Sequence, residues 1–155
     1  GVEKPASTLD DVDDLYTLGY GATFPIALEG ALKLKEITYA HCEGMLSTEF
    51  KHGPLSAVTE NYPIIFTAGK NDIPLIISGI NEVAARGARA IVIGPDDKRL
   101  HDNADDLIII PDVEDDNISA LLAVLPLQLL SYHMSVARGY DPDFPRNLSK
   151  TLTVD

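Results

Sequence analysis

Apolar positions along the chain fall into short runs and longer periodic stretches, which predict strands and helices in alternation. Runs of strand length occur at residues 15–18, 63–67, 90–93 and 107–110. The last two runs are continuously apolar, a pattern typical of parallel strands that are covered on both faces.

Three longer stretches carry apolar residues at helical spacing. They cover about residues 24–39, 73–86 and 117–137, and Gly87 and Gly139 follow the last two as helix stops. Strands that alternate with helices of this length favour an open sheet with right-handed crossovers. The sequence therefore predicts an α/β fold, a three-layer α/β/α sandwich around a mostly parallel sheet.

Three segments lack these patterns. Residues 1–13 end in an acidic cluster and predict a solvated lead-in before a single domain at residues 14–139, within which residues 41–59 predict an irregular polar connection. Residues 140–155 are polar and contain prolines, which is typical of a frayed tail. We nevertheless expect this C-terminal tail to be ordered, because it carries two cations and four apolar residues suited to anchor it: Phe144, Leu148, Leu152 and Val154.

Charge and cysteine content exclude several classes of protein. The chain has 12 Lys and Arg residues against 24 Asp and Glu, a formal charge of −12 that repels nucleic acid. Cys42 is the single cysteine, so no disulfide framework forms, and we expect a cytoplasmic protein. No apolar run approaches the ~18 residues of a membrane span, and the first residues do not resemble a signal sequence. We therefore expect neither membrane insertion nor secretion.

Three charged residues fall on one stripe of the helix predicted at 24–39. On a wheel of about 100° per residue, Glu29, Lys33 and Glu36 lie within about 60° of one another. The positions around them are mostly apolar, so we predict a mainly buried helix. The stripe fits a simple ion pair on a solvated face, worth about 0.2–0.5 kcal/mol. It equally fits two carboxylates held by one lysine for proton transfer.

Among the histidines, His52 is the candidate for chemistry, because Gly53 and Pro54 restrict the backbone next to it. A histidine there can carry a proton near neutral pH, although most loop histidines have no such role. No spacing typical of a metal site occurs. The glycines at 19–21 fit a tight strand-to-helix turn or, as the weaker alternative, an anion-binding turn.

Three segments together resemble a known enzyme family. They are PIALEGALKLKEI at 25–37, EFKHGP at 49–54 and FPRNLSKTLTVD at 144–155. They resemble the second sugar isomerase (SIS) domain of the glucosamine-6-phosphate synthase family, which makes glucosamine 6-phosphate from fructose 6-phosphate and glutamine. The resemblance runs from about residue 15 to the last residue. It implies a flavodoxin-like fold and an enzyme that needs no cofactor and no metal.

The resemblance implies roles for the stripe and the histidine. Glu36 matches the glutamate that moves a proton between C1 and C2 of the open-chain sugar. Lys33 matches a lysine of the same site, and Glu29 matches a glutamate one turn earlier that orients this lysine. His52 matches the histidine that opens the sugar ring, which in the family reaches the site from the neighbouring subunit of a dimer.

The resemblance also implies a role for the tail. Lys150 matches the lysine that forms an imine with the open-chain ketose. Because imine formation needs a neutral amine, we expect Lys150 in a partly dry place flanked by cations. Arg146 and Ser149 are expected to shape the same loop around the sugar.

Two parts of the family's complete enzyme have no match in these residues. They are the glutaminase domain and the first sugar isomerase domain, whose Ser/Thr-rich loop binds the sugar phosphate. We therefore expect the chain alone to be a poor or inactive catalyst, with a phosphosugar as its ligand and a homodimer as its assembly. Two other interpretations stay open: a non-catalytic phosphosugar sensor, and a related isomerase or deglycase for another phosphosugar. The imine-forming lysine favours the enzyme over the sensor.

Overall fold

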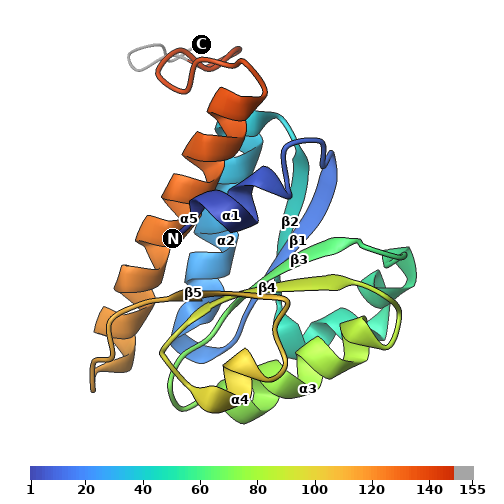
Figure 1. The fold of residues 1–155 in the computed structure, drawn as a ribbon, viewed down its shortest axis with the longest axis vertical. Coiled ribbons are helices and arrows are strands. Elements are labelled where there is room, and N and C mark those ends of the chain that lie inside the picture. The colour runs from blue at the N-terminus through green and yellow to red at the C-terminus, as the bar shows by residue number, and fades with distance from the viewer. Residues whose placement is uncertain (149–155) are drawn as a thin grey trace, which may run out of the picture.

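The computed structural model describes residues 1–148 and contains a five-stranded sheet in the order β2-β1-β3-β4-β5 (Figure 1). The strands are β1 (Asp14–Gly19), β2 (His41–Leu46), β3 (Pro63–Thr67), β4 (Arg89–Gly94) and β5 (Asp106–Ile109). All four strand pairs are parallel. The strand order reverses between β1 and β3, as in flavodoxin-like folds. The predicted α/β fold is thus confirmed.

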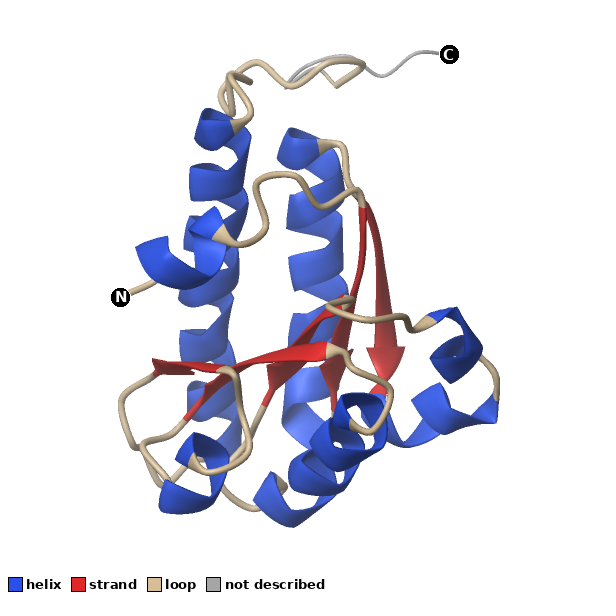
Figure 2. Cartoon of the chain, turned by 45° about the vertical axis from the view of Figure 1, so that its right-hand side comes forward, coloured by secondary structure: helices blue, strands red, loops and turns tan. Residues whose placement is uncertain are grey.

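Helices cover both faces of the sheet (Figure 2). The helices are α1 (Glu3–Ser7), α2 (Phe24–Thr38), α3 (Ile73–Ala84), α4 (Lys98–His101) and α5 (Asp116–Ala137). Helices α1, α2 and α5 share one hydrophobic core with one face of the sheet, whereas α3 and α4 share a second core with the other face. Neighbouring residues of the central strands serve opposite cores, since Ile65 and Ile91 join the first and Phe66 and Val92 the second. This double burial explains their continuous apolar runs.

The predicted helix ends agree with the structure. Gly87 (φ +79°) and Gly139 (φ +74°) adopt the left-handed conformation after α3 and α5, which glycine adopts without a steric penalty. At the start of α5, the Asp115 carboxylate accepts from the backbone N–H of Asn117 at 2.9 Å. This cap satisfies a backbone donor that the first turn of the helix leaves free.

Helix α5 is the one helix within residues 1–148 that is long and apolar enough to cross a membrane, with a mean hydropathy of 1.5. The sequence predicted no such segment, because Ser, Gln and His interrupt its apolar residues. Its inner face packs on α2 and the sheet, and Leu127, Leu130 and Met134 are fully buried there. Such packing is typical of the core helix of a globular domain, which passes the same test of length and composition.

The prediction of a solvated lead-in at residues 1–13 was wrong. Helix α1 forms there, and Ala6 and Leu9 are buried in the core that α2 and α5 share with the sheet. Sequence patterns missed this segment because its few apolar residues stand among acidic ones. A five-residue helix has too few turns to show a period.

Arg138, the residue after α5, ties this segment to the rest of the domain. Its guanidinium donates to the backbone carbonyls of Asp10 at 2.8 Å, of Thr38 at 3.0 Å, and of Val12. We call these contacts the Arg138 clasp. It joins the N-terminal segment to the ends of α2 and α5.

A buried acid begins β5. Asp106 keeps only 4% of its side chain exposed and lies 2.5 Å from Arg89 Nη2 and 3.1 Å from Lys4 Nζ. Burial raises the pKa of Asp106, but hydrogen bonds from Arg89 and Lys4 outweigh this effect and hold the pKa below its usual range. Asp106 is therefore a buried carboxylate that depends on its cations.

The irregular connection predicted at 41–59 was also wrong. Strand β2 pairs with β1 along its full length, and two 3₁₀ helices follow, η2 (Ser47–His52) and η3 (Pro54–Ala57). Because β2 is an edge strand, only Cys42 is fully buried and the remaining residues stay partly or fully exposed. A half-exposed edge strand lacks the apolar run that identifies the central strands.

Candidate active site

Glu29, Lys33 and Glu36 lie together on α2. The Lys33 ammonium donates to Glu36 Oε2 at 2.6 Å and lies 3.7 Å from Glu29 Oε1. The hydrogen bond to Glu36 and the charges of both glutamates raise the pKa of Lys33, although burial lowers it. Lys33 therefore keeps its proton at neutral pH and holds the Glu36 carboxylate in place, which leaves the carboxylate as the group suited to act as a base.

Helix α2 is half-buried rather than mainly buried, which corrects the prediction. Its inner face lies close to α5: a Cβ added at Gly30 would stand 2.8 Å from side-chain carbons of Leu127. Leu28 and Leu32 nevertheless stay 44% exposed on the outer face, and Glu36 stays 28% exposed. The charged stripe lies between these faces, so its carboxylates remain accessible.

The stripe ends at a cavity of about 630 Å³ beside the last turn of α2. This volume falls within the ~300–1,000 Å³ typical of small-molecule sites. Its lining comes from α2, the start of β2 and the C-terminal tail: Leu32, Lys35, Glu36, Tyr39, Ala40, His41, Arg146, Asn147 and Leu148. Glu36 and Arg146, both singled out in the sequence, thus line one cavity.

Tyr39 holds the tail against this cavity. It ends α2 in the left-handed conformation (φ 62°), and the Arg146 guanidinium lies 3.9 Å from the centroid of its ring. The backbone N–H of Arg146 donates to the Tyr39 hydroxyl at 3.0 Å, and the Tyr140 ring packs 4.7 Å away. Sequence reasoning missed Tyr39, whose only signal was an aromatic residue directly after a predicted helix.

The tail is held differently from the prediction. Phe144 and Leu148, expected to be anchors, are 82% and 54% exposed. The cation-π contact and hydrogen bond of Arg146 hold this part of the tail instead. Apolar spacing misled here because the turn at Asp141–Phe144 directs the side chain of Phe144 outward. Leu152 and Val154, the other two predicted anchors, lie outside the described residues.

The other predicted site residues are not brought to this cavity by the described chain. His52 ends η2, is exposed and does not line the cavity. Its 3₁₀ helix packs against β2 and α3, on another side of the domain from the tail. Ser149 and Lys150 lie outside the described residues 1–148, so their roles stay predictions.

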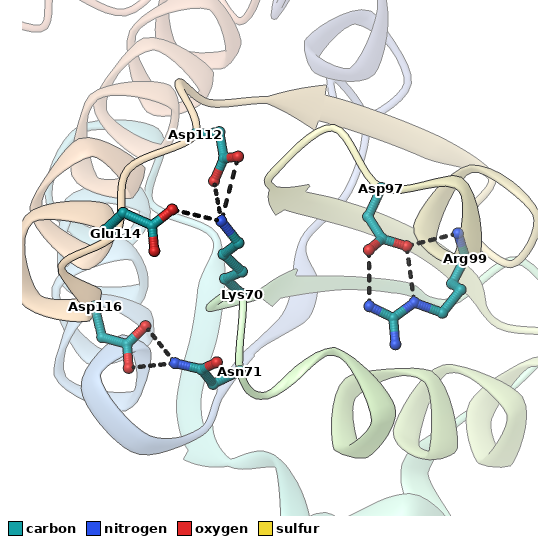
Figure 3. A network of polar contacts seen from close by, with 7 residues as sticks. All are labelled: Lys70, Asn71, Asp97, Arg99, Asp112, Glu114 and Asp116. Atoms are coloured by element: carbon teal, nitrogen blue, oxygen red, sulfur yellow. Dashed lines mark hydrogen bonds and ion pairs between the residues drawn. The ribbon is translucent and has the colours of Figure 1, made fainter.

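The cavity lies near the amino ends of β1 and β2. At the other end of the strands, loops follow their carboxyl ends; we call this end the carboxyl edge. In doubly wound folds this edge binds ligands where the strand order reverses, here between β1 and β3. Lys70 Nζ lies 3.2 Å from Asp112 Oδ1 and 3.3 Å from Glu114 Oε1. Asn71 donates to both carboxylate oxygens of Asp116, at 2.9 and 3.1 Å. Figure 3 shows these contacts joining the loop after β3 to the start of α5.

The Asp72 carboxylate lies between two turns at this carboxyl edge, one after β1 and one after β3. A Cβ added at Gly21 or at Gly69 would lie 3.0 Å from Asp72 Oδ2, so the carboxylate packs close to both backbones. Burial and the charge of Asp116 raise the pKa of Asp72. A carboxylate in this position opposes a bound anion. The glycines at 19–21 therefore serve the tight turn, and Gly21 adopts a φ of +54° there.

Two other kinds of chemistry have no support in residues 1–148. No group of three His, Cys, Asp or Glu side chains there is placed to hold a metal ion. Burial raises the pKa of Cys42 to about 12, so its thiol stays protonated at neutral pH. A protonated, buried thiol is a poor nucleophile.

Curated proteins resemble this chain along its whole length. It is 47% identical over 157 residues to the glutamine-fructose-6-phosphate aminotransferase (isomerizing) of Methanothermobacter thermautotrophicus, with 100% of this chain and 27% of that protein covered. The enzyme of the same name from Synechocystis sp. is 45% identical, over 99% of this chain and 25% of the relative. The chain thus spans about a quarter of the length of these relatives.

A solved structure and a family model agree with this similarity. The C-terminal domain of glucosamine-fructose-6-phosphate aminotransferase from Francisella tularensis superimposes with a TM-score of 0.80 at 37% identity, covering 90% of this chain and 40% of that one. The SIS domain model matches residues 8–138, which include the whole sheet and helices α2 to α5. The chain is homologous to the C-terminal SIS region of these aminotransferases, and it belongs to the SIS domain family.

Proposed function

We propose that this chain forms the isomerase part of an enzyme that converts fructose 6-phosphate and glutamine-derived ammonia into glucosamine 6-phosphate. The observation that carries the proposal is the ion pair between Lys33 Nζ and Glu36 Oε2, 2.6 Å apart, because Glu36 also lines a cavity to which the tail contributes. Relatives at 45–47% identity are named for an isomerizing aminotransferase reaction on this sugar phosphate.

Glu36 is the base of the proposed isomerization. It takes a proton from C1 of the open-chain sugar that carries an imine at C2; the C–H electron pair forms a C1=C2 double bond and the imine nitrogen takes up a proton. Return of the proton from Glu36 to C2, with loss of the proton of the C1 hydroxyl, then leaves the amine at C2 and the aldehyde at C1. Lys33 keeps the carboxylate oriented, and Glu29 lies 3.7 Å from the Lys33 ammonium on its other side.

The tail supplies the imine-forming amine in this proposal. Lys150 condenses with the C2 carbonyl of the open-chain ketose and releases water; ammonia then displaces the lysine amine and leaves the C2 imine on which Glu36 acts. Arg146 and Ser149 shape the loop around the sugar. In support, the tail reaches the cavity at residues 146–148, and Lys150 follows two residues later in the sequence. A lysine acting this way must lose its proton to attack the carbonyl.

Two components of the site come from elsewhere in this proposal. As the family resemblance implies, His52 opens the sugar ring in the cavity of a neighbouring subunit of a homodimer; in support, His52 does not line the cavity of its own chain. The resemblance likewise implies that another part of a longer polypeptide holds the sugar phosphate; in support, acidic side chains occupy the carboxyl ends of the strands in this chain. The chain by itself is then inactive.

A chimera tests the proposal. This chain replaces the homologous quarter of the Methanothermobacter thermautotrophicus aminotransferase, and formation of glucosamine 6-phosphate and hydrolysis of glutamine are both measured. We expect isomerization in the chimera, a loss of about 10³-fold or more with Glu36→Gln, and unchanged glutamine hydrolysis. Glu43→Gln, on the exposed edge strand, is the matched control. Full isomerization in the Glu36→Gln chimera contradicts the assigned base.

Calorimetric titration of the isolated chain with fructose 6-phosphate is the second test. No heat at millimolar sugar is expected if the phosphate site lies elsewhere. Micromolar binding by the isolated chain contradicts the proposal that another part of a longer polypeptide holds the sugar phosphate, and favours the phosphosugar sensor.

A further inference from the structure

A histidine lines the cavity together with Glu36. Of the four histidines, all of which lie within residues 1–148, His41 is the one found in the cavity lining. Tyr39 ends α2 in the left-handed conformation, and β2 begins two residues later at His41, so the end of the helix and the start of the strand border the same space. Histidine is the side chain that both gives and accepts a proton near neutral pH. The cavity therefore combines a carboxylate with an imidazole.

A neighbouring carboxylate orients the ring of His41. Asp14 begins β1 opposite His41 in the parallel register, and its Oδ1 lies 3.0 Å from His41 Nδ1. The backbone N–H of His41 donates to the carbonyl of Asp13 at 2.7 Å, which secures the same end of the strand. Because an ionised carboxylate only accepts hydrogen bonds, Nδ1 carries a proton, and Nε2 is left to exchange a proton with a ligand.

The His41–Asp14 pair is not needed for the fold. The two side chains are 75% and 61% exposed, and ion pairs that are so exposed contribute little to stability. The same exposure leaves the imidazole accessible from the cavity. An accessible histidine that a carboxylate orients, beside a second carboxylate suited to act as a base, is an arrangement typical of proton-transfer sites.

The proposed isomerization requires a carrier for two further protons. Glu36 moves the proton between C1 and C2, but the C2 nitrogen must also gain a proton and the C1 hydroxyl must lose one. Lys33 is unsuited to this, because its pKa is raised and its ammonium donates to Glu36 at 2.6 Å. The C1 oxygen and the C2 nitrogen are bonded to adjacent carbons, so one ring nitrogen can reach both.

We propose that His41 carries the proton between the C2 nitrogen and the C1 oxygen and that Asp14 positions its ring, an inference that rests on the proposed function. As Glu36 takes the proton of C1, protonated His41 gives its Nε2 proton to the imine nitrogen. As Glu36 returns its proton to C2, His41 Nε2 takes the proton of the C1 hydroxyl. Both side chains then regain their starting states. A carboxylate that serves carbon and a histidine that serves the heteroatoms also divide the work in the isomerization of another sugar phosphate.

Steady-state kinetics of the chimera described above test the role of His41. His41→Ala is expected to lower the kcat of isomerization about 100-fold or more. Imidazole added to the buffer should raise the rate of this variant about tenfold, because the exposed position leaves room for it, and should not raise that of Glu36→Gln. His101→Ala is the matched control: His101 lies 2.8 Å from Asp96 outside the cavity, and its replacement should leave kcat unchanged. A rate in His41→Ala close to that of the unsubstituted chimera, or a loss that imidazole does not reverse, overturns the role.

A double-mutant cycle tests whether Asp14 acts through His41. Asp14→Ala should lower kcat about tenfold when His41 is present and should have no further effect in His41→Ala. Equal losses in the two backgrounds would mean that Asp14 acts independently of the ring, and they overturn its positioning role.

Glu36→Gln separates this inference from the proposed function. If the chimera is active, Glu36→Gln is inactive and His41→Ala keeps the full rate, then the role of His41 alone is overturned. If Glu36→Gln itself keeps the full rate, the proposed function is overturned, and the role of His41 is overturned with it.

Discussion

The two ends of the parallel sheet hold charged side chains in opposite arrangements. At the carboxyl edge, Lys70 lies between Asp112 and Glu114, so its charge joins two loops (Figure 3). At the amino ends of β1 and β2, Glu36 has Lys33 as its ion-pair partner and lines a cavity of about 630 Å³. The first arrangement uses its charges to hold the fold, whereas the second leaves a carboxylate accessible to a ligand.

This comparison teaches that a cluster of charged residues is not by itself a site. The carboxyl edge is where doubly wound folds bind ligands, yet here Asp72 packs against Gly21 and Gly69. The amino end would not be chosen from topology alone. The amino end is distinguished by a cavity next to the Glu36 carboxylate, whose partner Lys33 stays protonated.

The largest expected effect comes from testing one carboxylate at each end in the chimera described above. Glu36→Gln lowers the kcat of isomerization about 10³-fold or more because the base is lost. Asp72→Asn changes it less than about threefold, because that carboxylate only packs against turns. Steady-state kinetics with fructose 6-phosphate measure both. Equal losses in the two variants would break the comparison.

The second effect concerns Asp106, a charge at the amino end that is buried instead of accessible. Asp106→Asn leaves Arg89 and Lys4 without their carboxylate and should lower the free energy of unfolding by about 2–4 kcal/mol. Because the folded-state pKa of Asp106 lies below its usual value, this contribution is present above about pH 4 and is lost as the pH falls further. Urea titrations at pH 7 and pH 3 measure it. If the free energy of unfolding differs between the wild type and Asp106→Asn by as much at pH 3 as at pH 7, the ion-pair explanation is contradicted.

The third effect concerns how the tail is held at the cavity. Tyr39→Ala removes the ring beneath Arg146 and a hydrogen-bond acceptor, together worth about 1 kcal/mol. Trypsin should then cleave after Arg146 about fivefold faster, since 1.4 kcal/mol corresponds to tenfold. Tyr39→Phe keeps the ring but loses the hydroxyl, so its cleavage rate is expected to lie between those of the wild type and Tyr39→Ala. Unchanged cleavage in Tyr39→Ala would show that other contacts hold the tail.

The smallest effect returns to the carboxyl edge. The raised pKa of Asp72 means that its charged form opposes folding: the cost is absent below about pH 4 and grows as the pH rises through the folded-state pKa. Asp72→Asn should therefore stabilise the protein by about 0.5 kcal/mol at pH 7 and leave it unchanged at pH 3. Asp112→Asn, which weakens the hold on Lys70, should act in the opposite direction. Thermal unfolding at both pH values compares them.

The central strands β3 and β4 could be predicted from the sequence because their side chains are buried on both faces of the sheet. Helix α2 produces a strong periodic pattern. Strand β5 was also found from its apolar run, but the expected burial on both faces was wrong, because β5 is an edge strand and its Ile109 is 51% exposed. Strand β2 and helix α1 produce no such local pattern, because each is identified by contacts with distant residues: β2 by pairing with β1, and α1 by packing against α5. Local periodicity contains no information about either contact.

The candidate site was predictable only in part, for a related reason. Glu29, Lys33 and Glu36 share one helix, so their spacing placed them together. Tyr39 and Arg146 meet across 107 residues of sequence, and no spacing rule joins them. The tail's apolar residues suggested the wrong anchors, because Phe144 has the right character for burial but no surface to pack on.

The Arg138 clasp also bears on how fast the protein folds and unfolds. Its three hydrogen bonds reach carbonyls that are 100 to 128 residues away along the chain. Contacts of such long sequence separation form after the entropy of closing a large loop has been lost, so they belong to the late steps of folding. Replacing Arg138 should therefore leave the folding rate nearly unchanged and accelerate unfolding, which makes this residue a determinant of the lifetime of the native state.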